Sequence, residues 1–360
     1  MPEGHTVHRL AAAFEQAFSG QRVRTSSPQG RFSDATQLNG MVLLGAEAVG
    51  KHLFLPFAPA EDVERDAPVV RHVHIHLGLY GSWTFAGEPG FSDAHAIGAP
   101  RLRIGEREER LDSEEQDGGG ATDWRRLVPR PTVRLRIAGP TGLADLTGPT
   151  ACEIMDAHER QAVLDRLGPD PLRADADPSR FVDAVRRSRT TIGALLMNQK
   201  IVAGIGNIYR AELLFRARLD PFVPGKDLST GMLEEMWEDL VALMTYGART
   251  GRIVTTQPEH RDLEPRIIER SRGTRQNGDE DPDVVSRERS FYVYHRQTLP
   301  CRLCGTTVRS AELAARTVFW CSRCQSVRSR RAGWTREHPA APWALEAEGA
   351  DVLAAGDGAA

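Results

Sequence analysis

The 360-residue chain begins Met1-Pro2-Glu3, and these residues have the types needed for covalent chemistry on a sugar. Because Pro2 has a small side chain, we expect Met1 to be removed, which leaves a secondary amine at the chain terminus. Such an amine can attack a sugar carbon and form a charged Schiff base. The carboxyl group of Glu3 can pass protons to and from the same sugar. Proline is also common at helix starts, where its missing N–H costs nothing.

A helix must position this terminus. Apolar residues recur at helical spacing and predict an amphipathic helix from about Glu3 to Phe18, with its stripe on Val7, Leu10, Ala11, Phe14 and Phe18. The amine then sits at the positive end of the helix dipole, which disfavours its protonated form and keeps it nucleophilic. A helix that buries its apolar stripe also holds the terminus in place, whereas most chain termini fray.

Four cysteines near the far end of the chain have metal-ligand spacing, in two Cys-x2-Cys pairs separated by 16 residues: Cys301, Cys304, Cys321 and Cys324. The spacing predicts one structural Zn²⁺ held by four thiolates; coincidental cysteines or a redox pair are the alternatives. Thr306–Arg309 and Thr317–Trp320 are expected to form a hairpin between the pairs, with Arg316 near its turn. Cys152 stands alone and is expected to be a small buried hydrophobe.

A further candidate site lies in the segment 198–210, Asn-Gln-Lys-Ile-Val-Ala-Gly-Ile-Gly-Asn-Ile-Tyr-Arg. An apolar helix, then Gly204 and Gly206, then Asn207 at the start of another helix is typical of a helix–turn–helix. Asparagine is a good N-cap, and exposed N–H groups at a helix start bind phosphate. The alternative is an αα-hairpin with glycine turns and no ligand.

Two tight turns lie between expected strands. The first, at 50–52, contains Lys51, and a lysine in a loop is usually only a solvated charge. The second, at 77–81, has Leu79 and Tyr80 at its tip. These side chains could act as wedges that fill a gap in a base stack, or they could fold back onto the sheet.

Three histidines alternate along one expected strand and share one face: His72, His74 and His76. They could form a metal site. We favour a polar sheet face, because the sequence shows no partner carboxylate for them.

Composition narrows the class of protein. No apolar run approaches the roughly 20 residues that cross a membrane, and the charged opening lacks the apolar core of a signal peptide. The sequence therefore predicts a cytoplasmic, nucleoid-associated protein. The formal net charge is −3, but residues 291–332 contain eight arginines against one glutamate, a cationic footprint that suits phosphates.

The periodicity predicts an α+β multidomain protein. Residues 1–150 are expected to form the initial helix and a β-sandwich with strands at Val42–Leu44, Leu53–Phe57, Val69–Leu77, Ser82–Phe85 and Thr132–Ile137. From Ala151 the period becomes helical, and 151–250 is expected to be a helical DNA-binding domain with helices near 151–167, 178–187, 190–198, 207–217 and 229–249. The remaining segments are a polar linker or insertion (251–290), a zinc finger (291–328) and a disordered tail (329–360).

These motifs, in this order, resemble the bacterial Fpg/Nei family of DNA glycosylases and AP lyases over nearly the whole chain from Pro2 to Gln325, and most closely its endonuclease VIII-like enzymes of actinobacterial type. The resemblance rests on PEG at the start, GKHLF, HLGLYG, VAGIGNIYRAELLF and YVYHRQTLPCRLCG…RTVFWCSRCQ. The segments at about 105–122 and 255–289 have no clear family counterpart.

The resemblance implies a monomeric, bifunctional base-excision-repair enzyme that acts on damaged DNA, needs no small-molecule cofactor and favours oxidised pyrimidines. Pro2 would be the Schiff-base nucleophile and Glu3 the acid/base, and Lys51 would assist elimination and contact phosphate. Asn207 and Arg316 would grip phosphates, with Arg316 also implied in the second elimination. The alternatives are an oxidised-purine glycosylase, a non-catalytic lesion-binding protein and a zinc-ribbon transcription factor.

Overall fold

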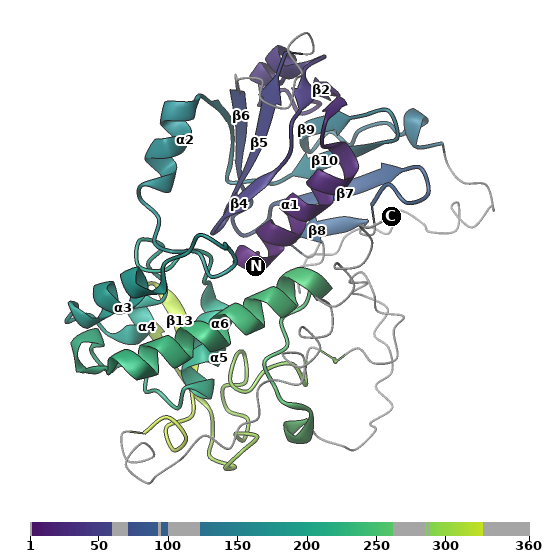
Figure 1. Ribbon diagram of the computed structural model, residues 1–360. Helices are drawn as coiled ribbons and strands as arrows, with labels where there is room; N and C mark the ends of the chain where they lie inside the picture. Colours follow the sequence, from purple (N-terminus) through teal and green to yellow (C-terminus); the bar gives the residue numbers. More distant parts are fainter. Residues whose placement is uncertain are drawn as a thin grey trace, which may run out of the picture. The chain divides into compact units, whose positions relative to one another are not determined.

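The computed structural model describes residues 2–59, 71–92, 95–99, 123–261, 285–286 and 288–326 (Figure 1). The expected tail, 329–360, and the insertion near 105–122 lie outside these residues. The chain divides into two compact units, the first ending at Leu167 and the second beginning at Gly168.

The first unit is a β-sandwich with one long helix, α1 (Gly4–Phe18). Its six-stranded sheet contains β1 (Gln21–Arg22), β3 (Val42–Leu43), β4 (Glu47–Val49), β5 (His52–Ala58), β6 (Arg71–His76) and β11 (Ala151–Met155). These strands follow the order β1-β3-β5-β6-β11, and β4 pairs with β5. The five-stranded sheet has the order β2 (Arg24–Ser26), β9 (Val133–Ala138), β10 (Gly142–Thr147), β7 (Ser82–Gly87) and β8 (Ala96–Gly98). Each of the five predicted strands has a counterpart here, although the first two residues of the predicted Val69–Leu77 strand lie outside the described residues.

One apolar core joins α1 to both sheets (Figure 1). Phe14 of α1 is fully buried, and its ring packs edge-on against Trp83 of β7 at 4.7 Å. Truncating a buried phenylalanine of this kind typically costs about 3–5 kcal/mol of stability. The predicted amphipathic helix therefore does bury its apolar stripe, and this burial fixes the start of the chain.

The expectation of helical structure from Ala151 is wrong for the first five residues. Residues 151–155 form β11, which pairs antiparallel with β6. The helix α2 (Ala157–Leu164) begins only after a capping box in which Asp156 accepts from the Glu159 amide and Glu159 accepts from the Asp156 amide. Val163 of α2 packs with Phe54, so α2 covers part of the outer face of the six-stranded sheet (Figure 1).

The second unit is built on four helices, α3 (Pro178–Arg186), α4 (Ile192–Leu195), α5 (Asn207–Arg216) and α6 (Thr230–Thr250). Their apolar faces share one core. The helix expected over 190–198 is shorter, because residues after Leu195 turn towards Gly204, which has a positive φ of 91°. Ser229 caps α6 by accepting from the Met232 amide, and Gly251 ends it in the left-handed conformation.

A two-stranded hairpin, β12 (Arg309–Leu313) and β13 (Arg316–Trp320), completes the second unit. The second strand starts one residue before the predicted Thr317–Trp320, and the first begins at Arg309, where the predicted strand Thr306–Arg309 ended. The reason is that residues before Arg309 bond to the chain around Cys301 instead. The Thr306 carbonyl accepts from the Cys301 amide, and the Val308 amide donates to the Leu299 carbonyl. Ala314 and Ala315 form the two-residue tip, and both have positive φ.

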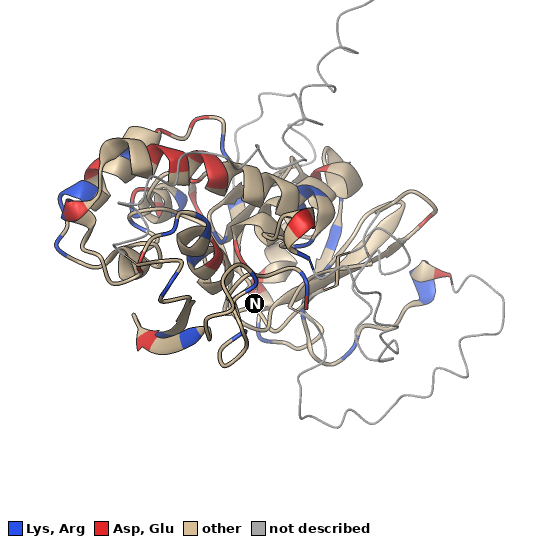
Figure 2. Ribbon diagram, turned by 90° about the horizontal axis from the view of Figure 1, so that it is seen from below, with Lys and Arg blue, Asp and Glu red and all other residues tan. Residues whose placement is uncertain are grey.

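Acidic and basic residues are interspersed along the described ribbon (Figure 2). The described part of the cationic segment, 291–326, carries five arginines against Glu312. Among the described residues, no helix is long and apolar enough to cross a membrane.

Candidate functional site

The chain terminus is held at the start of α1. Pro2 is buried and Glu3 is 0 % exposed. Glu3 is the N-cap residue in extended conformation, and its main-chain carbonyl accepts from the Thr6 amide at 3.0 Å. Its carboxylate does not cap the helix. The main chain of Glu3 is therefore fixed by the start of the helix, while its carboxyl group, the expected acid/base, is not used as the helix cap.

His5, on the first turn of α1, is a buried titratable group next to this terminus. Burial, reinforced by the positive charges of the chain terminus, His8 and Arg9, lowers the pKa of His5 to about 3. The ring is therefore neutral at physiological pH, and it adds no positive charge at the helix start.

Lys51 lies in the two-residue turn that joins β4 to β5, where Val49 pairs with His52. Gly50 has a φ of 60°, a left-handed conformation that glycine adopts without strain. The turn holds Lys51 half-buried at the end of the hairpin.

The Leu77–Gly81 segment is a tight turn after β6, closed by the Gly81 amide donating to the Leu77 carbonyl at 2.9 Å. A Cβ on Gly78 would lie 1.8 Å from Oγ1 of Thr150, so only glycine fits there. Leu79 and Tyr80 are 38 % and 56 % exposed. Both side chains therefore reach solvent, which a wedge residue must do.

The histidine face does have a carboxylate partner, which sequence reasoning missed. Nδ1 of His74 lies 2.9 Å from Oε1 of Glu153, and Nε2 of His74 lies 2.8 Å from Nδ1 of His52. Glu153 stands opposite His74 in the β11–β6 register, 79 residues away in sequence. No local pattern could reveal that pairing.

In the second unit, Asn207 begins α5, but it is not the N-cap. Gly206 occupies that position, and no side chain caps the helix. The Asn207 amide instead donates to the Thr317 carbonyl of β13 at 3.0 Å and accepts from Arg210. The prediction of an asparagine N-cap is therefore wrong, because a tertiary contact claims the side chain.

Arg210 fastens the hairpin to α5. Its guanidinium is fully buried and donates to the main-chain carbonyls of Leu313 and Thr317, both at 3.0 Å. Arg316 lies between these two acceptors and is exposed. The exposed guanidinium of Arg316 is thus carried by a hairpin whose backbone is held by hydrogen bonds from Arg210.

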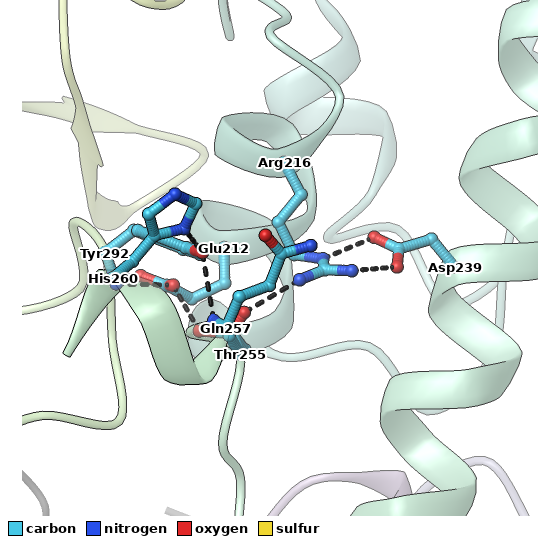
Figure 3. A network of polar contacts seen from close by, with 7 residues as sticks. All are labelled: Glu212, Arg216, Asp239, Thr255, Gln257, His260 and Tyr292. Atoms are coloured by element: carbon cyan, nitrogen blue, oxygen red, sulfur yellow. Dashed lines mark hydrogen bonds and ion pairs between the residues drawn. The ribbon is translucent and has the colours of Figure 1, made fainter. Parts of the chain in front are cut away.

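Glu212, two residues further along α5, holds the chain that leads into the cysteine module (Figure 3). Its carboxylate is fully buried and accepts from the amides of Tyr292, Val293 and Tyr294 at 2.7–2.9 Å and from the Thr255 hydroxyl. Burial raises the pKa of Glu212, and these hydrogen bonds oppose that shift.

The same network includes residues assigned to a polar linker. Thr255, Thr256 and Gln257 are buried, and the Thr255 carbonyl accepts from Arg216, which also pairs with Asp239 at 2.6 Å (Figure 3). His260 contacts the Tyr292 hydroxyl at 2.8 Å. The start of the 251–290 segment is therefore part of the packed unit; residues 262–284 lie outside the described chain.

The four cysteine sulfurs lie within 4.8 Å of one another. Contact with Cys324 lowers the pKa of Cys301 to about 5, and the same contact raises the pKa of Cys324. A closed set of four soft sulfur ligands this close together fits a structural Zn²⁺, which would bind them as thiolates. Such an ion would make the hairpin rigid and, with four protein ligands, would have no open position for chemistry.

The predicted site residues therefore fall into two groups. Pro2, Glu3, Lys51 and the tip of the Leu77–Gly81 turn belong to the first unit, and Asn207, Arg316 and the cysteines belong to the second. Sequence reasoning missed Arg210, Glu212 and Glu153, which hold other residues in place.

The fold and these motifs define a class of protein, the DNA glycosylases of the Fpg/Nei family, and comparison with known proteins shows that the chain belongs to it. Residues 1–117 match the formamidopyrimidine-DNA glycosylase N-terminal domain, 167–259 match its H2TH domain, and 299–327 match the zinc finger found in FPG and IleRS.

Among individual relatives, Endonuclease 8 1 of Mycobacterium tuberculosis is 42% identical over 327 residues, which cover 91% of this chain and all of that protein. Probable endonuclease 8 2 of Streptomyces coelicolor is 27% identical over 92% of this chain and 97% of its own. A solved complex of Lactococcus lactis Fpg with an abasic-site-containing DNA has a TM-score of 0.60 at 16% identity, covering 90% of this chain and 99% of that one. The fold agrees with the family assignment.

Proposed function

We propose that the protein is a bifunctional DNA glycosylase and AP lyase that removes oxidised bases, with pyrimidines favoured. The observation that carries this proposal is the start of the chain: Pro2 and a fully buried Glu3 are held at the N-terminus of a packed helix in a member of this family. A protein that only senses lesions has no need of this arrangement.

The chemistry follows from the amine. After the damaged nucleotide leaves the base stack, at a cost of a few kcal/mol, the Pro2 nitrogen bonds to the anomeric carbon and the bond to the base breaks. Glu3 supplies and removes protons at the sugar, which opens to a Pro2 iminium. The iminium acidifies the neighbouring sugar carbon. Loss of that proton expels one phosphate by β-elimination, and δ-elimination then expels the other.

Binding to DNA is assigned to residues of both units. Lys51 would contact phosphate and assist elimination, and Leu79 with Tyr80 would fill the gap left by the displaced nucleotide. Asn207 would act through α5, where the main-chain N–H groups at the helix start suit a phosphate. Arg316 would hold a phosphate with its planar fork and assist the second elimination. Zn²⁺, held by the four cysteines, would keep the hairpin rigid and take no part in bond breaking.

Borohydride trapping on a panel of lesion-bearing oligonucleotides tests both chemistry and substrate. The expected result is a covalent adduct with an abasic site and with oxidised pyrimidines, formed only by protein whose Met1 has been removed. If the protein is only a lesion sensor, it will bind lesion-bearing duplexes but form no covalent adduct with any of them.

The main alternative within the family is an oxidised-purine glycosylase. It is favoured by relatives such as the Geobacillus kaustophilus protein named formamidopyrimidine-DNA glycosylase, 32% identical over 172 residues, although these cover only 46% of this chain. Adducts formed faster with oxidised purines than with oxidised pyrimidines in the same panel would establish this alternative.

A further inference from the structure

The outer face of the six-stranded sheet carries a line of hydrogen-bonded side chains that the proposed reaction does not use. Glu153 on β11 contacts His74 on β6 at 2.9 Å, and His74 contacts His52 on β5 at 2.8 Å. The two imidazole rings are nearly parallel, with 17° between their planes and 5.1 Å between their centroids. We refer to Glu153, His74 and His52 as the relay.

Counting protons along the relay fixes its tautomers. An ionised carboxylate only accepts, so Nδ1 of His74 must carry the proton that faces Glu153. In a neutral His74 the other nitrogen, Nε2, is then an acceptor, and Nδ1 of His52 must donate to it. A neutral His52 that carries its proton on Nδ1 has a bare lone pair on Nε2.

The surroundings keep both rings neutral. Burial is the largest cause that lowers the pKa of His52, to about 3. Electrostatic repulsion from nearby basic groups lowers it further; these groups are His74, His76, Arg166 and Lys51. Burial also lowers the pKa of His74, against the opposing effect of Glu153. His76 is neutral for the same reason, with Lys51 the next cause, and its Nδ1 accepts from the Gly78 amide at 3.2 Å.

The end of the relay adjoins the expected phosphate-contacting lysine. His52 is the first residue of β5 and directly follows Lys51 in the turn. The turn therefore places Lys51 beside the end of the relay, and its charge is among the causes that lower the pKa of both His52 and His76. A bare imidazole nitrogen there offers an acceptor to the ammonium, whereas a protonated ring would repel it.

We propose that the relay makes His52 a positioning residue for Lys51 in the elimination steps. The relay holds Nε2 of His52 as an acceptor, which orients the lysine ammonium before DNA arrives. This inference rests on the proposed lyase function.

The strand itself offers a matched pair of variants. His74→Phe keeps a ring of similar shape but removes both relay nitrogens. His72→Phe makes the same change two residues away on the same face, at a position that is also buried and that stands opposite Pro56 and Met155. Thermal melting of both proteins checks that the fold is kept.

The first readout does not depend on activity. Nitrogen-15 NMR of the histidine side chains at pH 7 should show His52 protonated on Nδ1 and bare on Nε2 in the wild type and in His72→Phe. In His74→Phe, the proton of His52 should no longer be confined to Nδ1, and the spectrum should show a mixture of the two neutral tautomers. A wild-type His52 that carries its proton on Nε2 overturns the relay.

The second readout is single-turnover cleavage of a duplex with a preformed abasic site, measured from pH 5.5 to 8.5. We expect His74→Phe to be slowed roughly tenfold at pH 7, the size of effect that loss of an orienting partner produces, and His72→Phe by less than about twofold. Equal rates for the two variants contradict the positioning role. A wild type that neither cleaves this duplex nor gives a borohydride adduct refutes the proposed function instead, while the NMR result stands.

Glu153 provides a test by conservative replacement. Glu153→Gln keeps a carbonyl that accepts from Nδ1 of His74, whereas Glu153→Leu removes the acceptor. We expect cleavage by Glu153→Gln to stay close to the wild type and Glu153→Leu to follow His74→Phe. Equal losses in the two Glu153 variants, or no loss in either, would count against the relay.

Discussion

The side-chain amide of Asn207 donates a 3.0 Å hydrogen bond to the main-chain carbonyl of Thr317, 110 residues further along the chain. Thr317 follows Arg316 in β13. The start of α5 and the exposed arginine are therefore parts of one rigid piece, held also by Arg210. Two residues expected to grip phosphates reach their positions through a shared contact within the second unit.

Replacing the terminal amine tests the nucleophile. Pro2→Gly exchanges a secondary amine for a primary one, and we expect the lyase step to slow by at least about tenfold, with DNA binding retained. Single-turnover cleavage and a binding titration measure the two effects. A protein with an uncleaved N-terminal tag should give no borohydride adduct; full trapping of that protein would exclude Pro2 as the nucleophile.

Loss of a zinc ligand should affect the second unit selectively. Cys304→Ser and Cys321→Ser are expected to release the metal and weaken DNA binding, because metal-binding energy is folding energy for such small modules. Metal analysis and hydrogen exchange of β5 and β6 check both the loss and the intact sandwich. Cys152→Ala is the matched control and should keep its metal. Wild-type protein purified without zinc would refute the assignment.

Arg316→Ala should weaken binding to all DNA sequences about equally and reduce the salt dependence by roughly one phosphate contact. The zinc should remain, since no ligand changes. Arg309→Ala, an exposed arginine on the opposite strand of the hairpin, is the control. An unchanged salt slope in Arg316→Ala, with a reduced slope in Arg309→Ala, would move the phosphate contact to Arg309.

Glu212→Gln should destabilise the second unit. Each carboxylate oxygen of Glu212 accepts from two donors, so an amide group would face two of them with its own N–H groups. We expect a loss of about 3 kcal/mol in the free energy of unfolding, measured by denaturant titration. Glu234→Gln, on the exposed face of α6, should leave it unchanged. Equal stability of the two variants would rule out Glu212 as the anchor.

Stability should fall in acid because of His5. Its pKa is lowered to about 3 in the folded protein from an ordinary value of 6.5, so the unfolded chain binds the proton first as pH falls. The contribution is fully present above about pH 6.5 and is lost towards pH 3, at up to about 1.4 kcal/mol per pH unit. His5→Gln should flatten the curve of unfolding free energy between pH 7.5 and 5, whereas exposed His158→Gln should not. Parallel curves for all three proteins would contradict the prediction.

Local pattern was enough to predict much of this fold. Alternation predicted strands such as β5 and β9, and helical spacing predicted α1 and α6, because each of these elements buries one face. Ala151–Met155 escaped because five residues of mixed character fit either period, and only pairing with β6 decides between them. The roles of Asn207 and Glu153 escaped for a related reason: their partners lie 110 and 79 residues away.

The hairpin tip has a consequence for association with DNA. Ala314 and Ala315 hold φ values of 54° and 55°, which cost an alanine roughly 1 kcal/mol each, where glycine would be relaxed. Glycine would also let the backbone of the tip sample many conformations in the free protein, and binding would then have to restrict them at a cost in entropy. Alanine restricts the tip already when the chain folds, so under the proposed function Arg316 would meet a phosphate with less ordering left for association to do.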